Sequence, residues 1–477
     1  MLSFAIPMDL PVIVKKSGAV ARAQLKASYD RLNNRQLKQN LLQAVPFWIA
    51  SVITGLVAVA YAKLFALAEG VTHFVFLHYA WLIFIMAPVC FVVAWWLVKK
   101  YAPYARGSGI PQVAAALEVT NPKNEKLVDK LLSIRVIIIK LFSSLIMAMG
   151  GAAVGREGPT IQIAATIFRK INNLLPAWWP KIAKSNVIVA GAAAGLAAAF
   201  NTPLGGIVFA IEELTKTHFS YFKTAIFSSV IIAGLTAQGM VGPYLYLGYP
   251  KIEGSSAFIF VDVILVALLT GLGGSIMTKI ILALFKWKRN FKFNYQFALY
   301  AAICAVILAA LAFFIDPGTM GSGKDLMERT LFESDKHVEW YTPLLRIIGP
   351  IMSFTSGGAG GVFAPALSAG AGIGAMVSGW FSLGEANTNL LVLAGMVGFL
   401  TGVTRSPFTS AILVLEMTDR HNIIFHLILA GMVASLAALL IDKHSFYDHM
   451  KNQYIRKLAA EDELTKNKRD MENEALA

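Results

Sequence analysis

The sequence contains little charge and almost no cysteine. Asp, Glu, Lys and Arg together make up 15% of its 477 residues and hydrophobic residues 56%, whereas soluble globular proteins carry about a quarter charged residues. The two cysteines, Cys90 and Cys304, lie within apolar runs, so we expect them to pack as small hydrophobic side chains. The composition excludes a soluble globular protein and a disulfide framework, and the sequence predicts no metal site and no cofactor.

The apolar residues gather into long runs. Most of these runs reach the roughly 20 residues needed to cross a hydrocarbon core about 30 Å thick. The runs occupy 45–68, 74–98, 131–150, 222–247, 258–285, 297–314 and 423–441. They predict a multi-pass membrane protein.

Positive charge is concentrated beside the ends of these runs. The formal net charge is +14, but the chain lacks the long basic block of a nucleic-acid-binding arm. Basic residues follow the runs at Lys99, Lys100, Arg106, Lys286, Lys288, Arg289, Lys292, Lys443, Lys451, Arg456 and Lys457. Because such residues mark the cytoplasmic face, we expect both termini in the cytoplasm, an even number of crossings and no nucleic-acid partner.

Shorter apolar pieces interrupted by glycine and proline recur in the two halves of the chain. They occupy 150–177, 189–214, 357–383 and 391–417. At a shift of 206, Gly155 aligns with Gly361, Glu157 with Phe363 and Pro159 with Pro365; at a shift of 204, Pro203 aligns with Pro407 and Glu212 with Glu416. We therefore predict two homologous halves, 45–250 and 251–442, between cytoplasmic segments 1–44 and 443–477.

Interrupted segments in matched positions of two halves indicate a transporter with its site between the repeats. A helix that stops inside the bilayer is tolerated only where it lines a polar cavity, because backbone in lipid must satisfy its own hydrogen bonds. Its N-terminus exposes free N–H groups and about half a positive charge. Such an end is suited to binding an anion.

Three loops combine glycines with a proline at the expected start of a helix. They are Gly-Ser-Gly-Ile-Pro at 107–111, Gly-Arg-Glu-Gly-Pro at 155–159 and Gly-Gly-Val-Phe-Ala-Pro at 360–365. Glycine permits close approach of backbone to a ligand, and proline is well suited to the first helical turn. One such loop is equally well explained as a tight turn, but three in one membrane chain favour a shared site.

These motifs resemble those of the CLC family of chloride channels and chloride/proton antiporters. The resemblance covers about residues 45–450 and includes 193–203, followed by Ile-Glu-Glu at 211–213, and Tyr447 after the last run. It implies an all-helical membrane fold of two inverted-topology repeats with broken, re-entrant helices, in a homodimer with one pathway per subunit in the cell (inner) membrane. The stretch after Tyr447 is too short for the paired CBS domains of many eukaryotic relatives, so we expect the prokaryotic type without them.

The resemblance also assigns roles to residues. It implies that chloride is bound by the hydroxyls of Ser108 and Tyr447 and by the backbone around Gly109, Ile110, Val362 and Phe363. It makes Glu157 the external gate and Glu213 the internal proton-transfer residue. For Glu213 the spacing alone is equally consistent with a solvated helix end. The roles of Arg156 and Lys140 stay open between a ligand, a structural partner and, for Lys140, a side chain that reaches the interface.

Glu157 is informative without the family. A carboxylate at mid-membrane costs several kcal/mol unless its surroundings stabilise it, and a site built for anions does so. We hypothesise that ionised Glu157 occupies and blocks the anion pathway and that protonated Glu157 leaves it.

The sequence thus predicts an antiporter that exchanges chloride for protons across the lipid membrane. Glu213 favours this over a passive chloride channel, because the channel branch generally lacks a glutamate there. A fluoride/proton antiporter is a further alternative, although its relatives depart from the Gly-Ser-Gly-Ile-Pro pattern. An integral membrane enzyme is remote, because clustered catalytic side chains are lacking in the sequence.

Overall fold

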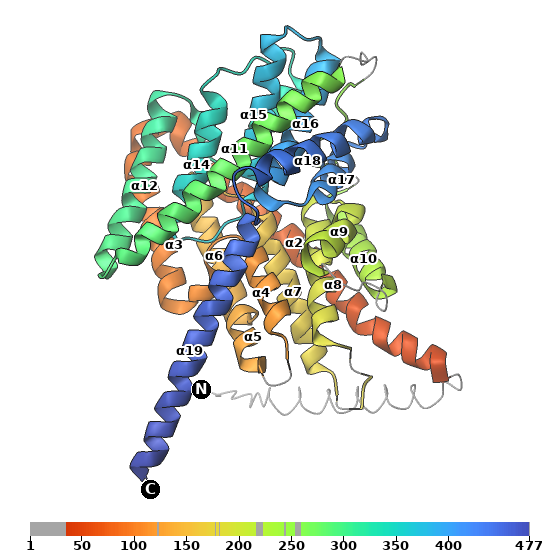
Figure 1. Ribbon diagram of the computed structural model, residues 1–477, viewed down its shortest axis with the longest axis vertical. Coiled ribbons are helices and arrows are strands. Elements are labelled where there is room, and N and C mark those ends of the chain that lie inside the picture. Colours follow the sequence, from red (N-terminus) through yellow and green to blue (C-terminus); the bar gives the residue numbers. More distant parts are fainter. Residues whose placement is uncertain are drawn as a thin grey trace, which may run out of the picture.

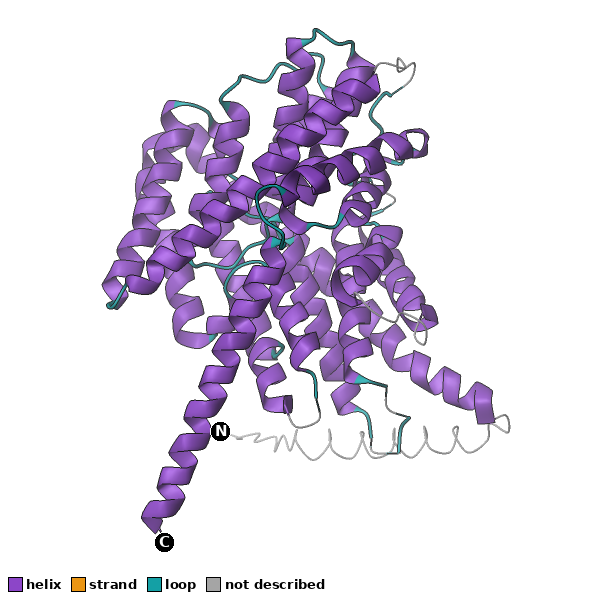
Figure 2. Cartoon of the chain, in the orientation of Figure 1, coloured by secondary structure: helices purple, strands orange, loops and turns teal. Residues whose placement is uncertain are grey.

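The computed structural model of the protein describes residues 35–121, 124–176, 178–180, 182–215, 223–242, 245–252 and 259–476. The predicted N-terminal segment, 1–44, lies outside the described residues as far as residue 34. The described chain is helical almost throughout (Figure 2). Figure 1 shows the helices packed into one body, from which α19 (Phe446–Leu476) extends.

The helices follow one another with short connections. The first half contains α2 (Arg35–Tyr79), α3 (Ile83–Tyr101), α4 (Ile110–Val119), α5 (Glu125–Leu131), α6 (Ile134–Met149), α7 (Glu157–Leu174), α8 (Lys184–Phe200), α9 (Pro203–Phe209) with the π-helical turn η4 (Ala210–Thr215), and α10 (Lys223–Val241). The second half contains α11 (Ile259–Trp287), α12 (Asn294–Phe314), α13 (Lys324–Phe332), α14 (Thr342–Ser356), α15 (Phe363–Trp380), α16 (Glu385–Thr404), α17 (Pro407–Thr418), α18 (Ile424–Leu439) and α19. Short 3₁₀ turns lie at Ala80–Leu82, Pro103–Ala105, Lys288–Asn290, Pro317–Thr319 and His421–Ile423.

Seven helical segments of the described chain are long and apolar enough to cross a membrane. They are Leu42–Tyr101, Glu125–Met149, Thr224–Val241, Ile259–Asn290, Asn294–Phe314, Glu385–Thr404 and His421–Leu439. Large apolar side chains on several of them are exposed, for example Phe425 at 76% and Leu436 at 65%. Exposed apolar surface of this extent is expected of helices that face lipid.

The piece at 391–417 is interrupted in the structure, as predicted, but its first part is longer than predicted. Helix α16 begins at Glu385, has 20 residues and ends at Thr404, and α17 follows. The break lies at Arg405, which has a left-handed backbone with φ 63°, and at Pro407, which begins α17. The apolar stretch of α16 is 89% buried, so this helix lies inside the body instead of facing lipid.

The two halves break their helices at equivalent residues. α7 begins at Glu157 and α15 at Phe363, and each has 18 residues. α9 begins at Pro203 and α17 at Pro407, in agreement with the preference of proline for the first helical turn. The sequence repeat is therefore also a repeat of helix starts.

Two glutamates connect the halves by the same contact made twice. Glu212 accepts hydrogen bonds from two N–H groups in the first turn of α17, at 3.2 and 2.6 Å. Glu416 does the same for the first turn of α9, at 3.0 and 2.6 Å. A self-complementary exchange of this kind is what a two-fold relation between two similar units produces. Glu212 is thus a helix cap, a role that the sequence did not indicate.

Candidate functional site

Three glycine-containing loops meet in the middle of the helical body, where Figure 2 shows loop segments among the helices. The N–H of Gly107 donates to the carbonyl of Gly358 at 2.9 Å, and its carbonyl accepts from the N–H of Gly360 at 3.2 Å. Gly155 and Gly361 exchange two such bonds, of 2.8 and 2.6 Å. The structure therefore brings the three predicted motifs together.

Glycine lets the first two loops touch. A Cβ atom at Gly158 would collide with Oγ of Ser108, and one at Gly109 would lie 2.7 Å from the carbonyl oxygen of Gly158. Gly107 and Gly109 have φ angles of +69° and +114°, which residues with a side chain rarely adopt. Ser108 is consequently fixed against the start of α7 and is 1% exposed.

The hydroxyls of Ser108 and Tyr447 are within reach of each other. Both residues are buried, yet within the described part of the protein neither hydroxyl makes a hydrogen bond of ordinary geometry. The ring of Phe363 stacks on that of Tyr447, with a centroid distance of 6.3 Å. A buried polar group without a partner costs about 1–3 kcal/mol, so two such hydroxyls at one position indicate a place for a polar ligand.

Helix N-termini surround the same position. α4 begins at Ile110, and α15 begins at Phe363 after Val362, and these residues are all at most 1% exposed. Neither N-cap residue, Gly109 for α4 or Val362 for α15, caps its helix with its own side chain. A buried helix end without partners for its N–H groups is unfavourable, and its positive potential attracts an anion. The arrangement offers neutral donors that are chemically suited to an anion.

Glu157 lies at the edge of this site. It begins α7 and is 1% exposed, and within the described residues its Oε2 atom has no hydrogen-bond partner. Its carboxyl group interacts with the backbone N–H of Ala364, in the first turn of α15. Among the charged side chains, Arg156 acts on it most strongly. The carboxylate thus occupies a position at a helix N-terminus that an anion would use.

Two polar side chains that support the Ser108 loop have structural partners. Lys140 is fully buried and donates from Nζ to the carbonyl of Gly107 at 2.8 Å. Gln112 donates from Nε2 to the carbonyl of Arg106 at 2.6 Å and to Oη of Tyr454 at 3.1 Å. Lys140 therefore positions the loop instead of reaching the interface. Gln112 connects the loop to α19, a role that its sequence context did not indicate.

Glu213 lies in the π-helical turn η4 and is 7% exposed. Its Oε2 atom accepts a hydrogen bond of 2.6 Å from Oγ of Ser406, at the start of α17. Glu213, Ser406, Phe363 and Tyr447 line one narrow space that is too small to hold a water molecule. π-helical turns are frequent at functional sites, and this one directs Glu213 toward the rings of the anion site.

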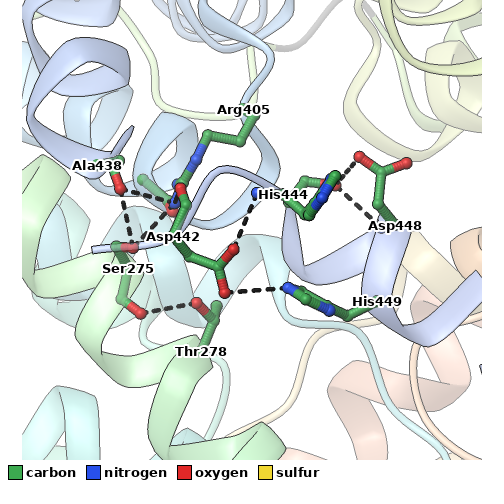
Figure 3. Close-up of polar contacts among 10 residues, drawn as sticks. Ser275, Thr278, Arg405, Ala438, Asp442, His444, Asp448 and His449 are labelled. Carbon is green, nitrogen blue, oxygen red and sulfur yellow. Dashed lines mark hydrogen bonds and ion pairs between the residues drawn. The ribbon is translucent and has the colours of Figure 1, made fainter. Parts of the chain in front are cut away.

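Tyr447 is held in place by the junction between α18 and α19, shown in Figure 3. Arg405 donates from Nη2 to Oγ of Ser275 at 2.9 Å and to the carbonyls of Ala438 at 3.0 Å and Asp442 at 3.1 Å. One side chain therefore joins the ends of α16 and α18 to the middle of α11. This role was not predictable from the sequence, because the partners are mostly backbone atoms.

The first turn of α19 is attached to the same junction. Oδ2 of Asp442 lies 3.0 Å from Nε2 of His449, and Oδ1 accepts from the N–H of His444 at 2.9 Å (Figure 3). Burial alone would raise the pKa of Asp442, but the N–H of His444 and the His449 ring outweigh it and hold the pKa below its usual value. An ionised Asp442 thus fixes the turn that carries Tyr447.

Metal-binding clusters are absent from the part of the chain that the structure describes. No group of three or more His, Cys, Asp or Glu side chains there could hold a metal ion. Cys90 and Cys304 are free thiols, and Cys304 is buried. The converging groups of the described site are hydroxyls, helix N-termini and two carboxylates.

The fold is also found in proteins of known structure. The chain is similar in structure to a slow cyanobacterial Cl⁻/H⁺ antiporter, with a TM-score of 0.76 and 23% identity over 87% of this chain and 98% of that one. A CLC-type fluoride/proton antiporter gives a TM-score of 0.73 and 19% identity, over 87% and 98%. A eukaryotic CLC transporter gives 0.68 and 18%, over 86% and 74%. The sequence profile of the family described as voltage-gated chloride channel matches residues 90–439. Because that match covers well over half of the chain, the protein belongs to this family, the CLC family of membrane transporters and channels.

Proposed function

We propose that this protein is an antiporter that exchanges chloride for protons. The observation that carries the proposal is the position of Glu157, a buried carboxylate that interacts with the first turn of α15, beside the unpartnered hydroxyls of Ser108 and Tyr447. The same binding position is thus used by the Glu157 carboxylate and by the permeant anion in turn. Members of the family are transporters and channels, so the integral membrane enzyme is set aside.

Chloride is held by neutral donors. The hydroxyls of Ser108 and Tyr447 and the N–H groups at the starts of α4 and α15 form a moderate binding site, which an ion is able to leave. The amine of Lys140 is engaged with the carbonyl of Gly107, so it supports the loop instead of binding the ion directly. A direct ammonium ligand would bind chloride too strongly for transport.

Glu157 couples the two ions by competition. When ionised, its carboxylate remains at the helix N-termini and excludes chloride. When protonated, it loses the electrostatic attraction to the N–H groups and leaves the site, so that chloride enters. A proton is therefore taken up whenever the gate opens and released when it closes.

Glu213 supplies protons from the other side. It and Ser406 line the narrow space that also contacts Phe363 and Tyr447, and the proton crosses this region between Glu213 and Glu157. The proton route and the chloride route thus meet near Tyr447 and separate between Tyr447 and Glu213.

The protein is placed in the cell (inner) membrane with both termini, 1–44 and 443–477, in the cytoplasm. This orientation rests on the basic residues beside the span ends, since positive residues mark the cytoplasmic side. We further propose a homodimer in which each subunit has its own pathway, because the described site is formed within one chain.

The test is a simultaneous measurement of chloride and proton flux from purified protein in liposomes. With a chloride gradient and no pH gradient, protons are expected to move opposite to chloride and to build up a pH difference. Glu213→Gln is expected to slow proton movement far more than chloride movement. Chloride flux without proton movement would instead identify a channel. Strong preference for fluoride over chloride would identify a fluoride antiporter.

A further inference from the structure

A groove lies between the end of α3 and the start of α12, far from the glycine loops in the sequence. Its volume is about 560 Å³. It is lined by Trp95, Trp96, Lys99 and Lys100 of α3 and by Asn294 and Tyr295 of α12. We call it the α3/α12 groove. No part of the transport mechanism uses it.

The groove carries two lysines oriented by aromatic rings. The ammonium group of Lys99 lies 5.1 Å from the ring centroid of Trp95 and donates to Oδ1 of Asn294. That of Lys100 lies 4.8 Å from the ring of Trp96. In the described part of the chain no carboxylate forms an ion pair with either lysine. The groove therefore keeps a double positive charge, and the first turn of α12 adds the positive end of a helix.

Both helices are membrane spans, and the groove lies at their ends. α3 ends at Tyr101 and α12 begins at Asn294. Arg106 follows the end of α3 closely in the sequence, and its carbonyl accepts a hydrogen bond from Oη of Tyr454 in α19. The groove consequently opens on the α19 side of the molecule, at the depth where tryptophan, tyrosine and lysine are enriched at a membrane surface.

Exposed apolar side chains continue from the groove along both helices. On α3 they recur every three or four residues at Ile85, Val89, Val93 and Trp96, and on α12 at Tyr295, Leu299, Ile303 and Val306. This spacing places each set on one helix face. A ligand in the groove thus meets positive charge at one end and two lipid-facing stripes below it.

We propose that the α3/α12 groove binds a membrane phospholipid with an anionic headgroup. The phosphate lies between the ammonium groups of Lys99 and Lys100 and the side-chain amide of Asn294, and the acyl chains follow the two apolar stripes. A basic pocket between membrane helices on the cytoplasmic side is suited to such headgroups. The apolar stripes favour a lipid over free phosphate, which would leave them unused.

The test is native mass spectrometry of the purified full chain titrated with phosphatidylglycerol or phosphatidylcholine. Wild type is expected to bind phosphatidylglycerol at least about tenfold more tightly, because each basic residue near the surface contributes about a fivefold attraction. Lys99→Gln combined with Lys100→Gln is expected to weaken that binding roughly thirtyfold. The matched control combines Lys126→Gln and Lys170→Gln, which are exposed and outside the groove, and should change binding less than about twofold.

Three results would overturn the proposal. They are equal binding of the two lipids by wild type, unchanged binding after the Lys99/Lys100 change, and full displacement of the lipid by millimolar inorganic phosphate. If the double variant does not fold, Trp96→Ala serves instead, since it removes one wall of the groove and keeps both charges. It should weaken phosphatidylglycerol binding by about threefold or more, because Lys100 loses the ring that orients it toward the groove, a contact worth about that factor, and unchanged binding would count against the proposal.

Discussion

The starts of α7 and α15 have nearly the same backbone and very different side chains. Both helices follow a glycine loop, both have 18 residues, and the two loops bond to each other through Gly155 and Gly361. The first helical residue is Glu157 in one and Phe363 in the other. The phenyl ring stacks on Tyr447, while the carboxylate reaches across to the first turn of α15.

The difference shows how two halves with similar backbones contribute different chemical groups to one site. Equal backbones supply two buried helix N-termini, which alone would form a symmetric anion site. A single charged side chain makes the site asymmetric, because only one half contributes a group that binds protons. Glu213 is likewise a carboxylate that only one half provides. When Glu212 is aligned with Glu416, the residue that aligns with Glu213 is Met417.

The largest effect is expected when α7 is made as free of charge as α15. In Glu157→Gln, chloride should still pass, but proton flux should fall to background, a loss of roughly a hundredfold or more for a positioned proton-transfer group. The measurement is paired chloride and proton flux in liposomes. Glu385→Gln, an exposed carboxyl in the first turn of α16, is the control and should keep coupling. Proton pumping by Glu157→Gln would refute the competition mechanism.

The two paired glycines should respond differently to alanine. A Cβ at Gly155 would collide with Oε2 of Glu157, a movable group, whereas one at Gly361 would lie 3.0 Å from the carbonyl oxygen of Gly155 and 3.1 Å from the amide nitrogen of Gly158. Gly155→Ala should therefore displace the gate and raise chloride flux relative to proton flux. Gly361→Ala should lower the free energy of unfolding by about 1–3 kcal/mol through overpacking. Flux and thermal unfolding in detergent distinguish them, and identical effects would contradict this difference.

The exchanged caps should respond similarly, with a somewhat larger effect at Glu212. Glu212→Gln and Glu416→Gln each weaken two charge-assisted bonds to a helix N-terminus, and Glu212 also accepts from Oγ1 of Thr409 at 2.6 Å. Each substitution should lower the free energy of unfolding by about 1 kcal/mol. The measurement is the unfolding temperature of both variants at one detergent concentration. A cost confined to one of them would show that the symmetry of the contacts does not extend to their energetics.

The smallest effect is expected at α19, which lies outside the repeat. Burial alone would raise the pKa of Glu461, but bonds from Lys130 and Tyr104 and the charges of Lys130 and Lys457 outweigh it and hold that pKa below the usual range. A lowered folded pKa gives stability that is present above the ordinary glutamate pKa of about 4.3 and is lost as the pH falls through the folded value.

Because Glu461 is 35% exposed, its pairing should contribute less than about 1 kcal/mol. Wild type should therefore unfold at a slightly higher temperature than Glu461→Gln at pH 7, and the difference should vanish near pH 3. A difference that persists at low pH would mean that packing, and not charge, distinguishes the two proteins.

Much of the fold followed from local pattern. The apolar runs predicted the membrane spans, and the three glycine loops predicted the helix starts that the structure contains at α4, α7 and α15. At 391–417 the predicted interruption is present, but the helix before it, α16, is longer than the sequence indicated. The left-handed turn at Arg405 is stabilised by bonds to Ser275 and Ala438, which lie far away in the sequence.

The residues of the candidate site were also predictable from the sequence only in part. The motif residues Ser108, Glu157 and Phe363 stood out because glycine and proline mark unusual backbone. Lys140 stood out only as a charge in an apolar run, and its partner was not predictable. Gln112 and Glu212 were not identified as connecting residues, because polar side chains at helix ends are common and their partners lie in another part of the chain.

The amino-acid sequence by itself determined that this protein lies in a membrane, that its chain repeats, and that several helices start within the bilayer, because hydrophobic length, proline and glycine act over a few residues. The tertiary structure alone decided that three loops meet at one point, that the Ser108 and Tyr447 hydroxyls face each other without partners, and that Glu157 reaches the start of α15. The physical reason is that such contacts join residues hundreds of positions apart, and their geometry depends on how whole helices pack.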